Sequence, residues 1–597
     1  MKQFFKIVFA SMLGFGATVF FTILVLVGVV AAMSGGDKDE KDLEVKENSV
    51  LYLDFSKGLV DKASDNPFET FDLNSFESNK KMSLMQVLNN LKKAKKDDNI
   101  KGAYLDLKGV SMNLANMDEI RSGLEDFKSS GKWIIAYGQD IGQGTYYLSS
   151  VADQIYVYPE GGVEFNGLMS EIMFFKGMLE KLEVEVQVIR GKNNKFKSAV
   201  EPFLYDKMSD PNREQLTKLL TTVWDNWTEK IAESRGISAA SLNEYADSLM
   251  AFNPANAVEY KLVDGLLFGD QVMDTLKAKL DVEEDDDVNF ISISKYTRAP
   301  EKYEEGELKP WERKDKIAII YGAGEIRSGN SDQETMGSRT IAKAIRKARK
   351  DSSIKAIVFR VNSPGGSALA SDVMWRETQL AKEAKPFVVS MGGLAASGGY
   401  YVSCDADRIF AGANTITGSI GVFGMIPNAK NMLNNKLGLT FDGVQTNANS
   451  DVGMLTKPLT TYQYGKIQQS VEKVYDTFLG HVSEGRSMTK DEVDAIGQGR
   501  VWTGEDALEL GLVDELGGLE DAIAYAAEQA GVTNYRITNF PEKKDPIQEF
   551  IKELTGESSS IFMKWKLGEF YNAYQTVERI TKSDRIQARI PFDIEIR

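Results

Sequence analysis

The chain has 597 residues, which is too long for one hydrophobic core. Its composition, with 42% hydrophobic and 26% charged residues, excludes a disordered or fibrous protein. Its net charge of −16 argues against a nucleic-acid partner, which would need a basic face. Because the chain has one cysteine and one histidine, it can form neither an intrachain disulfide nor a metal site built on several such ligands.

The amino-terminal segment is predicted to cross a membrane once. No charged residue occurs from Ile7 to Gly36, and most of this run is apolar. About 20 residues suffice for a transmembrane helix. Lys2 and Lys6 precede the run, so the positive-inside rule places the amino terminus in the cytoplasm and the rest of the chain on the far side. The small residues Val29 to Ala32 leave a cleaved signal peptide as an alternative, although its apolar region is usually shorter.

The body that follows repeats itself. Four segments recur at one spacing without a gap (351 − 97 = 254), and a fifth pair near the end of each unit recurs at a spacing of 250 (512 − 262 = 250). The pairs are Asp97–Gly102 with Asp351–Ala356, Trp133–Gly138 with Phe387–Gly392, Gly144–Tyr147 with Gly398–Tyr401, Ala152–Ile155 with Ala406–Ile409, and Leu262–Asp264 with Leu512–Asp514. We therefore predict two copies of one domain of roughly 250 residues.

Each copy alternates short β-rich runs with helical stretches, which predicts parallel sheets and an α/β fold. The runs are 103–107, 117–129 and 133–137 in the first copy, and 356–361, 371–383 and 387–391 in the second. The predicted organisation is an anchor with its cytoplasmic stub (1–36), a charged linker (37–48), a first repeat (49–298), a linker (299–315), a second repeat (316–540) and a tail (541–597). In the tail, the spacing of apolar residues from Ile547 to Leu554 predicts a helix that packs on the body, with a membrane-surface helix as the alternative.

Ser397 is the candidate nucleophile. It stands between a predicted strand and a helix that begins with two glycines, where free N–H groups and the helix dipole favour a developing anion. The turn 362–367 also follows a strand, so the backbone N–H groups of Gly366 and Gly398 could form an oxyanion hole. Turns of this kind are also common in α/β proteins without chemistry. The first copy carries Gln143 at the equivalent position (397 − 254 = 143) and therefore lacks the nucleophile.

Lys197 is the candidate general base. The only histidine, His481, lies in a helix-like, charged stretch that we interpret as solvated surface, so it is a poor base for a triad. A lysine can serve instead if burial lowers its pKa. Apolar and small residues surround Lys197 in segment 195–203, whereas the corresponding region of the second copy, 447–454, has no lysine. A surface lysine at a helix start is the alternative. Each copy is thus predicted to supply half of one site.

These motifs resemble the signal peptide peptidase A (protease IV) family in its long, duplicated bacterial form. The resemblance rests on Lys197–Phe203, Asn362–Gly366, Ala396–Tyr401 and Thr417–Gly421. It implies Ser397 as nucleophile, Lys197 as general base and Ser419 as the residue that hydrogen-bonds and orients the lysine. It further implies two tandem Clp-protease or crotonase-like domains after the anchor, a homotetramer, and cleaved signal peptides as substrates. The mechanism requires no metal or other cofactor. We expect a single-pass protein of the bacterial inner membrane with its catalytic body on the periplasmic side.

Two other functions remain open from the sequence. A crotonase-like acyl-CoA enzyme would also build oxyanion holes from backbone N–H groups, but the membrane span and the Ser397/Lys197 pairing weigh against it. A non-catalytic membrane scaffold is the second alternative, because the first copy shows that the repeat persists without a nucleophile. The joint presence of Ser397, Lys197 and Ser419 argues against a scaffold.

Overall fold

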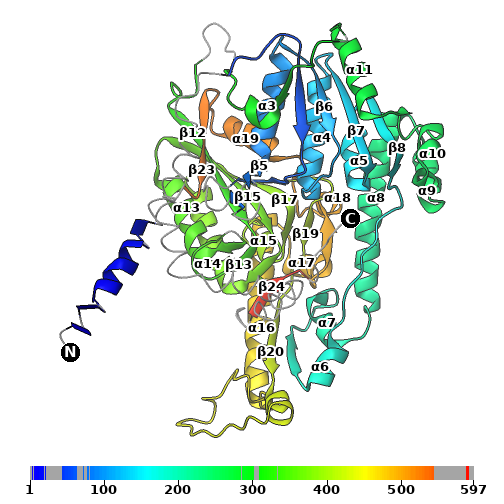
Figure 1. The fold of residues 1–597 in the computed structure, drawn as a ribbon. Coiled ribbons are helices and arrows are strands. Elements are labelled where there is room, and N and C mark those ends of the chain that lie inside the picture. Colours follow the sequence, from blue (N-terminus) through cyan, green and yellow to red (C-terminus); the bar gives the residue numbers. More distant parts are fainter. Residues whose placement is uncertain are drawn as a thin grey trace.

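The computed structural model describes residues 43–63, 71–72, 77–78, 81–283, 285–301, 308–332, 334–542 and 586–590, together with 3–4, 6–7, 9–18 and 20–21. The predicted span from Ile7 to Gly36 therefore lies partly outside the described residues. The predicted tail helix at 547–554 lies wholly outside them. Within the described ranges, no helix is both long and apolar enough to cross a bilayer. The helical residues 9–18 stand clear of the body (Figure 1).

The first half of the chain forms a six-stranded sheet in the order β10-β8-β7-β6-β1-β11, with every pairing parallel. The strands are β1 (Ser49–Asp54), β6 (Ile100–Asp106), β7 (Trp133–Ile141), β8 (Gln154–Val163), β10 (Gly265–Leu266) and β11 (Phe290–Ser292). Side chains alternate between its two faces, as strand geometry requires. Leu53 and Leu105 share a cluster with α3 (Leu84–Lys96) and α4 (Leu114–Lys128), whereas Tyr104 packs with α11 (Gly269–Leu280).

The second half forms the corresponding sheet, in the order β21-β19-β17-β15-β12-β23, with β18 and β22 branching from β17. Only the β19–β21 pairing is antiparallel among these described strands. The strands are β12 (Asp315–Ala323), β15 (Ile354–Ser363), β17 (Phe387–Ala396), β18 (Arg408–Ala411), β19 (Ile416–Gly418), β21 (Val501–Thr503), β22 (Glu515–Leu516) and β23 (Tyr535–Phe540). The predicted α/β class is thereby confirmed.

The internal repeat is also confirmed, and it extends to individual hydrogen bonds. The Tyr146 hydroxyl donates to the carbonyl of Leu262 at 2.8 Å. At the equivalent place in the second half, the Tyr400 hydroxyl donates to the carbonyl of Leu512 at 2.9 Å. All four residues lie in the segments that the sequence comparison paired, so both copies fix the helix after the third strand in the same way.

A third, mixed sheet joins the two halves, in the order β14-β13-β16-β24-β20-β9. Its strands are β9 (Glu185–Arg190), β13 (Glu325–Arg327), β14 (Thr335–Gly337), β16 (Gly365–Ser367), β20 (Phe423–Asn428) and β24 (Ile586–Arg589). Strand β9 comes from the first half and pairs antiparallel with β20 of the second, with Arg190 opposite Phe423. Through this pairing, one strand of the first half becomes the edge strand of a sheet whose other strands belong to the second half.

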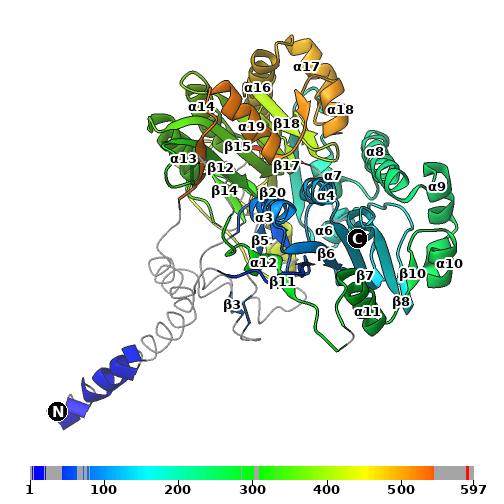
Figure 2. The ribbon, with the colours of Figure 1, turned by 90° about the horizontal axis from the view of Figure 1, so that it is seen from above.

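The two halves also share one hydrophobic core. The largest cluster combines first-half side chains such as Leu53 and Leu105 with Ile319 and Val358 of the second half, and with α19 (Leu519–Gln529). Figure 2 shows the two halves side by side, with α3 and α4 of the first half toward the second. Burial of this shared apolar surface fixes the relative position of the halves.

Neighbouring isoleucines of β12 offer a test of this shared core. Ile319 and Ile320 are both fully buried, but Ile319 packs in the shared cluster and Ile320 in a cluster of the second half together with Ile189. Alanine at either position should cost about 2–5 kcal/mol of unfolding free energy. We expect Ile319→Ala, but not Ile320→Ala, to speed hydrogen exchange in β6 of the first half. Equal exchange in the two variants would contradict a core shared through Ile319.

Candidate active site

Ser397 forms the tight turn between β17 and the short helix α15 (Gly398–Tyr401). Its backbone adopts φ 55° and ψ −110°, a left-handed conformation that non-glycine residues rarely take and that costs energy unless the surroundings enforce it. Two backbone bonds of 2.8 Å do so: Ser397 N–H donates to Gly418, and Tyr401 N–H donates to Ser397. The side chain of Ser397 is fully buried.

Lys197 reaches the second half from the loop that follows β9. It precedes the 3₁₀ turn Ser198–Val200, and it is 1% exposed. Helix α8 (Asp210–Arg235) holds this turn through two polar side chains. The Ser198 hydroxyl donates to Asn212 Oδ1 at 2.8 Å, and Gln215 Nε2 donates to the carbonyl of Phe196 at 3.1 Å. Groups of its own half thus hold the lysine backbone, and the second half adds one bond, because the N–H of Phe196 donates to the carbonyl of Gln498 at 3.0 Å.

The two predicted residues meet directly, although they are 200 positions apart. Lys197 Nζ lies 2.8 Å from Ser397 Oγ, and it donates to Ser419 Oγ at 2.9 Å and to the Ser419 carbonyl at 3.1 Å. Burial removes water from the ammonium and lowers the pKa of Lys197 well below its ordinary value. A neutral amine keeps a lone pair, so it can accept the hydroxyl proton of Ser397.

Ser419 and a glycine loop enclose the lysine side chain. The Ser419 hydroxyl donates to the carbonyl of Gly499 at 3.2 Å, so toward Lys197 it acts as an acceptor. Gly499 has φ +85°, and a Cβ there would lie 2.5 Å from Lys197 Cβ. A larger residue at 499 would therefore displace the lysine. Sequence reasoning missed this loop, although two glycines separated by one residue (Gly497 and Gly499) are a local signal for a tight turn.

The two predicted oxyanion glycines lie in adjoining turns. A Cβ added to Gly365 would lie 2.7 Å from the nitrogen of Gly398, so the turn carrying β16 abuts the start of α15. The N–H of Gly365 donates to Ser363 Oγ at 3.2 Å and is thus used within its own turn. Gly366 follows with φ +151°. The arrangement brings Gly366 and Gly398 to the same end of β15 and β17 as Ser397.

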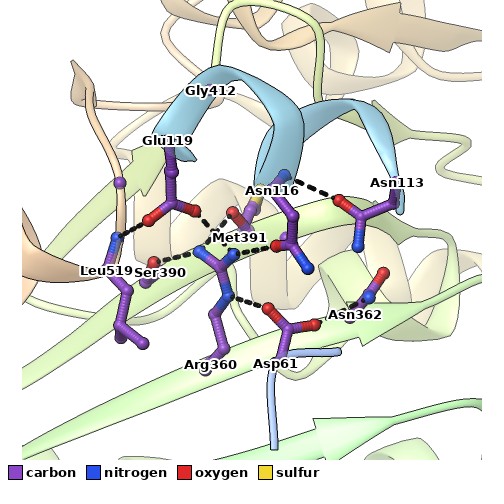
Figure 3. Close-up of polar contacts among 12 residues, drawn as sticks. Asp61, Asn113, Asn116, Glu119, Arg360, Asn362, Ser390, Met391, Gly412 and Leu519 are labelled. Atoms are coloured by element: carbon purple, nitrogen blue, oxygen red, sulfur yellow. Dashed lines mark hydrogen bonds and ion pairs between the residues drawn. The ribbon is translucent and has the colours of Figure 1, made fainter. Parts of the chain in front are cut away.

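A buried ion-pair network supports this turn from the first half (Figure 3). Arg360 of β15 is fully buried and donates to Asp61 Oδ1 at 2.8 Å and to Glu119 Oε1 at 2.6 Å. The other oxygen of Asp61 accepts a bond of 2.8 Å from Asn362 Nδ2, three residues before Gly365. Opposite charges at this depth interact strongly, and removing one partner leaves an uncompensated charge. Sequence reasoning missed these residues because Asp61 and Glu119 lie in no motif.

Two further residues have contacts that decide their roles. Gln143, the first-half equivalent of Ser397, accepts backbone N–H bonds of 2.9 Å from Asn166 and Gly167, so it serves as a buried cap.

His481 lies on α16 (Thr461–Arg486) and stacks on Trp375 with ring centroids 3.4 Å apart. Our expectation of a solvated histidine was wrong, since its side chain is only 14% exposed.

Replacement of Lys197 should change the pH dependence of stability. At pH values between its lowered folded pKa and the ordinary 10.5, the unfolded chain binds a proton at this site that the folded chain does not. Stability therefore falls as the pH decreases through that window. We expect Lys197→Met to raise Tm at neutral pH and to flatten the dependence of Tm on pH, with exposed Lys195→Met as the control. An unchanged profile in Lys197→Met would contradict a neutral buried lysine.

Asp61 should affect catalysis through the turn that it supports. Asp61→Asn removes the carboxylate charge that faces Arg360 and replaces the oxygen that accepts from Asn362 Nδ2 by an N–H donor. We expect kcat to fall roughly 10- to 100-fold, with a smaller change in KM. Glu119→Gln is the matched control, because Glu119 bonds Arg360 but has no bond to Asn362. It should lower Tm comparably while largely preserving kcat. Equal losses of kcat in both variants would contradict a positioning role of Asp61.

Comparison with known proteins gives a consistent result. A family model described as Peptidase family S49 matches residues 126–283 and 379–533, one segment in each half. Protease 4 from Salmonella typhi is 36% identical over 553 residues, which cover 90% of this chain and 87% of that protein. The chloroplastic serine protease SPPA from Arabidopsis thaliana is 32% identical over 523 residues, covering 86% and 74%.

Among solved structures, a ClpP1 mutant from Listeria monocytogenes aligns with 34% of this chain and 94% of its own, with 14% identity and a TM-score of 0.24. A score this low does not establish a shared fold, so the Clp-protease or crotonase-like classification of each half stays a prediction. The family match in both halves and the long alignment with Protease 4 establish the relationship independently of fold. The chain therefore belongs to peptidase family S49, in the long duplicated form, and is a serine peptidase.

Proposed function

We propose that this chain is a membrane-anchored serine endopeptidase that uses a Ser397/Lys197 dyad assembled from its two halves. The proposal rests on the 2.8 Å contact between Lys197 Nζ and Ser397 Oγ at a site from which water is excluded. A lysine with a lowered pKa is a competent base for a serine hydroxyl, and the only histidine of the chain is engaged with Trp375 and Asp372.

The geometry suits an acyl-enzyme mechanism. Neutral Lys197 takes the Ser397 proton as the hydroxyl oxygen attacks the scissile carbonyl carbon, and the N–H groups of Gly366 and Gly398 stabilise the resulting oxyanion. Lys197 then passes the proton to the leaving amine. Water, deprotonated by the same lysine, hydrolyses the ester and restores Ser397. Ser419 keeps the amine aimed at Ser397 throughout, because its hydroxyl and carbonyl both accept from Lys197.

Cleaved signal peptides are the proposed substrates, and the bacterial inner membrane is the proposed location. The motifs resemble those of the signal peptide peptidase A family, and the uncharged run from Ile7 to Gly36 suits a single-pass anchor. In the described part of that run, large apolar side chains are exposed, with Phe9 at 67% and Phe15 at 73%. Lipid would cover them. The same resemblance supports a homotetramer with its catalytic body on the periplasmic side.

Hydrolysis of an apolar reporter peptide by the full-length chain in detergent tests the dyad. Ser397→Ala and Lys197→Ala should each lower kcat by at least about 10²- to 10⁴-fold, because each removes a group that acts in the transition state. Exposed Lys195→Ala is the matched control and should retain full activity. Activity of wild type should also decline as the pH drops through the lowered pKa of Lys197, since the ammonium cannot accept a proton.

Full activity in Lys197→Ala would mean that another group is the base. No hydrolysis of any apolar peptide by the wild-type chain would instead contradict the proposed endopeptidase activity.

A further inference from the structure

Gln215 has a buried side chain whose hydrogen bonds reach both halves of the chain beside the proposed active site. It lies on α8 and is 1% exposed. Its amide nitrogen donates to the carbonyl of Phe196 at 3.1 Å and to Ser198 Oγ at 2.9 Å, and these two residues flank Lys197. Its amide oxygen accepts from the N–H of Val501 in β21 at 3.3 Å. One carboxamide thus joins the lysine segment of the first half (residues 195–203) to a strand of the second half.

Val501 follows the glycine loop that encloses the lysine side chain. The N–H of Gly499 in this loop donates to the carbonyl of Ile420 at 2.8 Å. The N–H of Ser419 donates to the carbonyl of Arg500 at 2.6 Å. The loop and Ser419 therefore hold each other in place, and the Ser419 hydroxyl accepts from the lysine amine. A shift of Val501 would move the groups that surround this amine.

Phe196 is held to the second half by its ring as well as by its backbone. The guanidinium carbon of Arg500 lies 4.6 Å from the ring centre of Phe196 and 4.4 Å from that of Trp502, which is within the range of a cation–π contact. The N–H of Phe196 donates to the carbonyl of Gln498 at 3.0 Å. The remaining backbone group of this residue is its carbonyl, and Gln215 holds it.

The lysine amine is neutral at this site because water is kept away from it. Burial lowers the pKa of Lys197, and no charged group of the described chain contributes to this lowering. Charged side chains on the adjoining segments bond elsewhere: the Glu201 carboxylate accepts from Asn212 Nδ2 at 3.1 Å, and an Arg500 nitrogen lies 2.9 Å from Glu214. Water admitted to the lysine would therefore raise its pKa toward the ordinary value, because water stabilises the ammonium.

We propose that Gln215 is a positioning residue that keeps the lysine segment and the Gly497–Gly499 loop closed around the amine of Lys197. The inference rests on the proposed dyad, because Gln215 acts through the lysine and not on the substrate. A glutamine side chain ends in a donor and an acceptor, and here the donor serves Phe196 and the acceptor serves Val501. Methionine offers neither group, and ionised glutamate offers only the acceptor.

The pH dependence of reporter-peptide hydrolysis by the full-length chain in detergent tests this role. In wild type, kcat/KM should rise with pH as Lys197 loses its proton. Gln215→Met keeps the length of the side chain but none of its bonds, so we expect the midpoint of this rise to move upward by about one pH unit and kcat at high pH to fall roughly 10-fold. Gln215→Glu keeps the acceptor for Val501 but places a carboxylate beside the lysine segment, so its midpoint should move further upward.

Val223→Ala on the same helix is the matched control. Val223 is 2% exposed and packs in the shared core, so its truncation should lower Tm without moving the midpoint. A wild-type midpoint in the Gln215 variants would overturn the positioning role, even if their Tm is lower. An equal upward shift in Val223→Ala would also overturn it, because loss of stability alone would then explain the shift. Gln215→Glu, which keeps the shape and one bond, decides the test if Gln215→Met does not fold.

Failure of the proposed function would give a different result. Wild type would then hydrolyse no reporter peptide, or Lys197→Ala would hydrolyse it with the wild-type pH profile. Either result contradicts the dyad, and the positioning role of Gln215 falls with it. A wild-type midpoint that depends on Lys197 but not on Gln215 would leave the dyad intact and overturn the positioning role alone.

Discussion

The rest of the structure depends on keeping the amine of Lys197 shielded from water and within hydrogen-bonding distance of the Ser397 hydroxyl. Lys197 has its lowered pKa only because it is buried, and it contacts Ser397 only because two halves of the chain stay in fixed register. A catalytic contact tolerates little displacement, since misplacement by about 1 Å can cost 100-fold in rate. The shared core, the β9–β20 pairing and the buried Arg360 network each hold the halves together at that precision.

The duplicated halves have kept the same framework while differing in chemistry. Both tyrosine-to-carbonyl bonds after the third strand remain, yet the first half has Gln143 where the second has Ser397, the proposed nucleophile. Gln143 satisfies two backbone N–H groups, so its position now contributes to stability. The first half contributes instead the lysine and, through Asp61, support for the glycine turn of the second.

Much of the fold could be predicted from the sequence because its signals are local or repeated. The segments spaced by 254 residues revealed the duplication, and the alternation of strand and helix patterns indicated the α/β class. The small and apolar residues around Ser397 and Lys197 made both of them candidates, and the resemblance of their motifs to a known peptidase family implied their roles. The structure brings the two together.

The remaining features depend on contacts between distant residues whose local sequence is ordinary. Nothing near Asp61 or Glu119 indicates a partner about 300 or 240 positions away, since a buried ion pair is defined by three-dimensional packing. Alternating apolar residues at Ile586, Ala588 and Ile590 do suggest a strand, but its partners β16 and β20 are short segments far away in the chain. His481 was misjudged for the same reason, because its stacking partner Trp375 lies on another helix.

The division of the site between the halves also bears on the time at which the chain becomes reactive. During synthesis the lysine leaves the ribosome 200 residues ahead of the serine, and β9 must wait for β20 before it can pair. In the proposed mechanism, a partly made chain therefore holds the base Lys197 without the nucleophile Ser397, and it cannot act as a protease on its own unfolded segments or on neighbouring nascent proteins. Under the same mechanism, activity cannot begin before β9 and β20 have paired, when most of the fold exists.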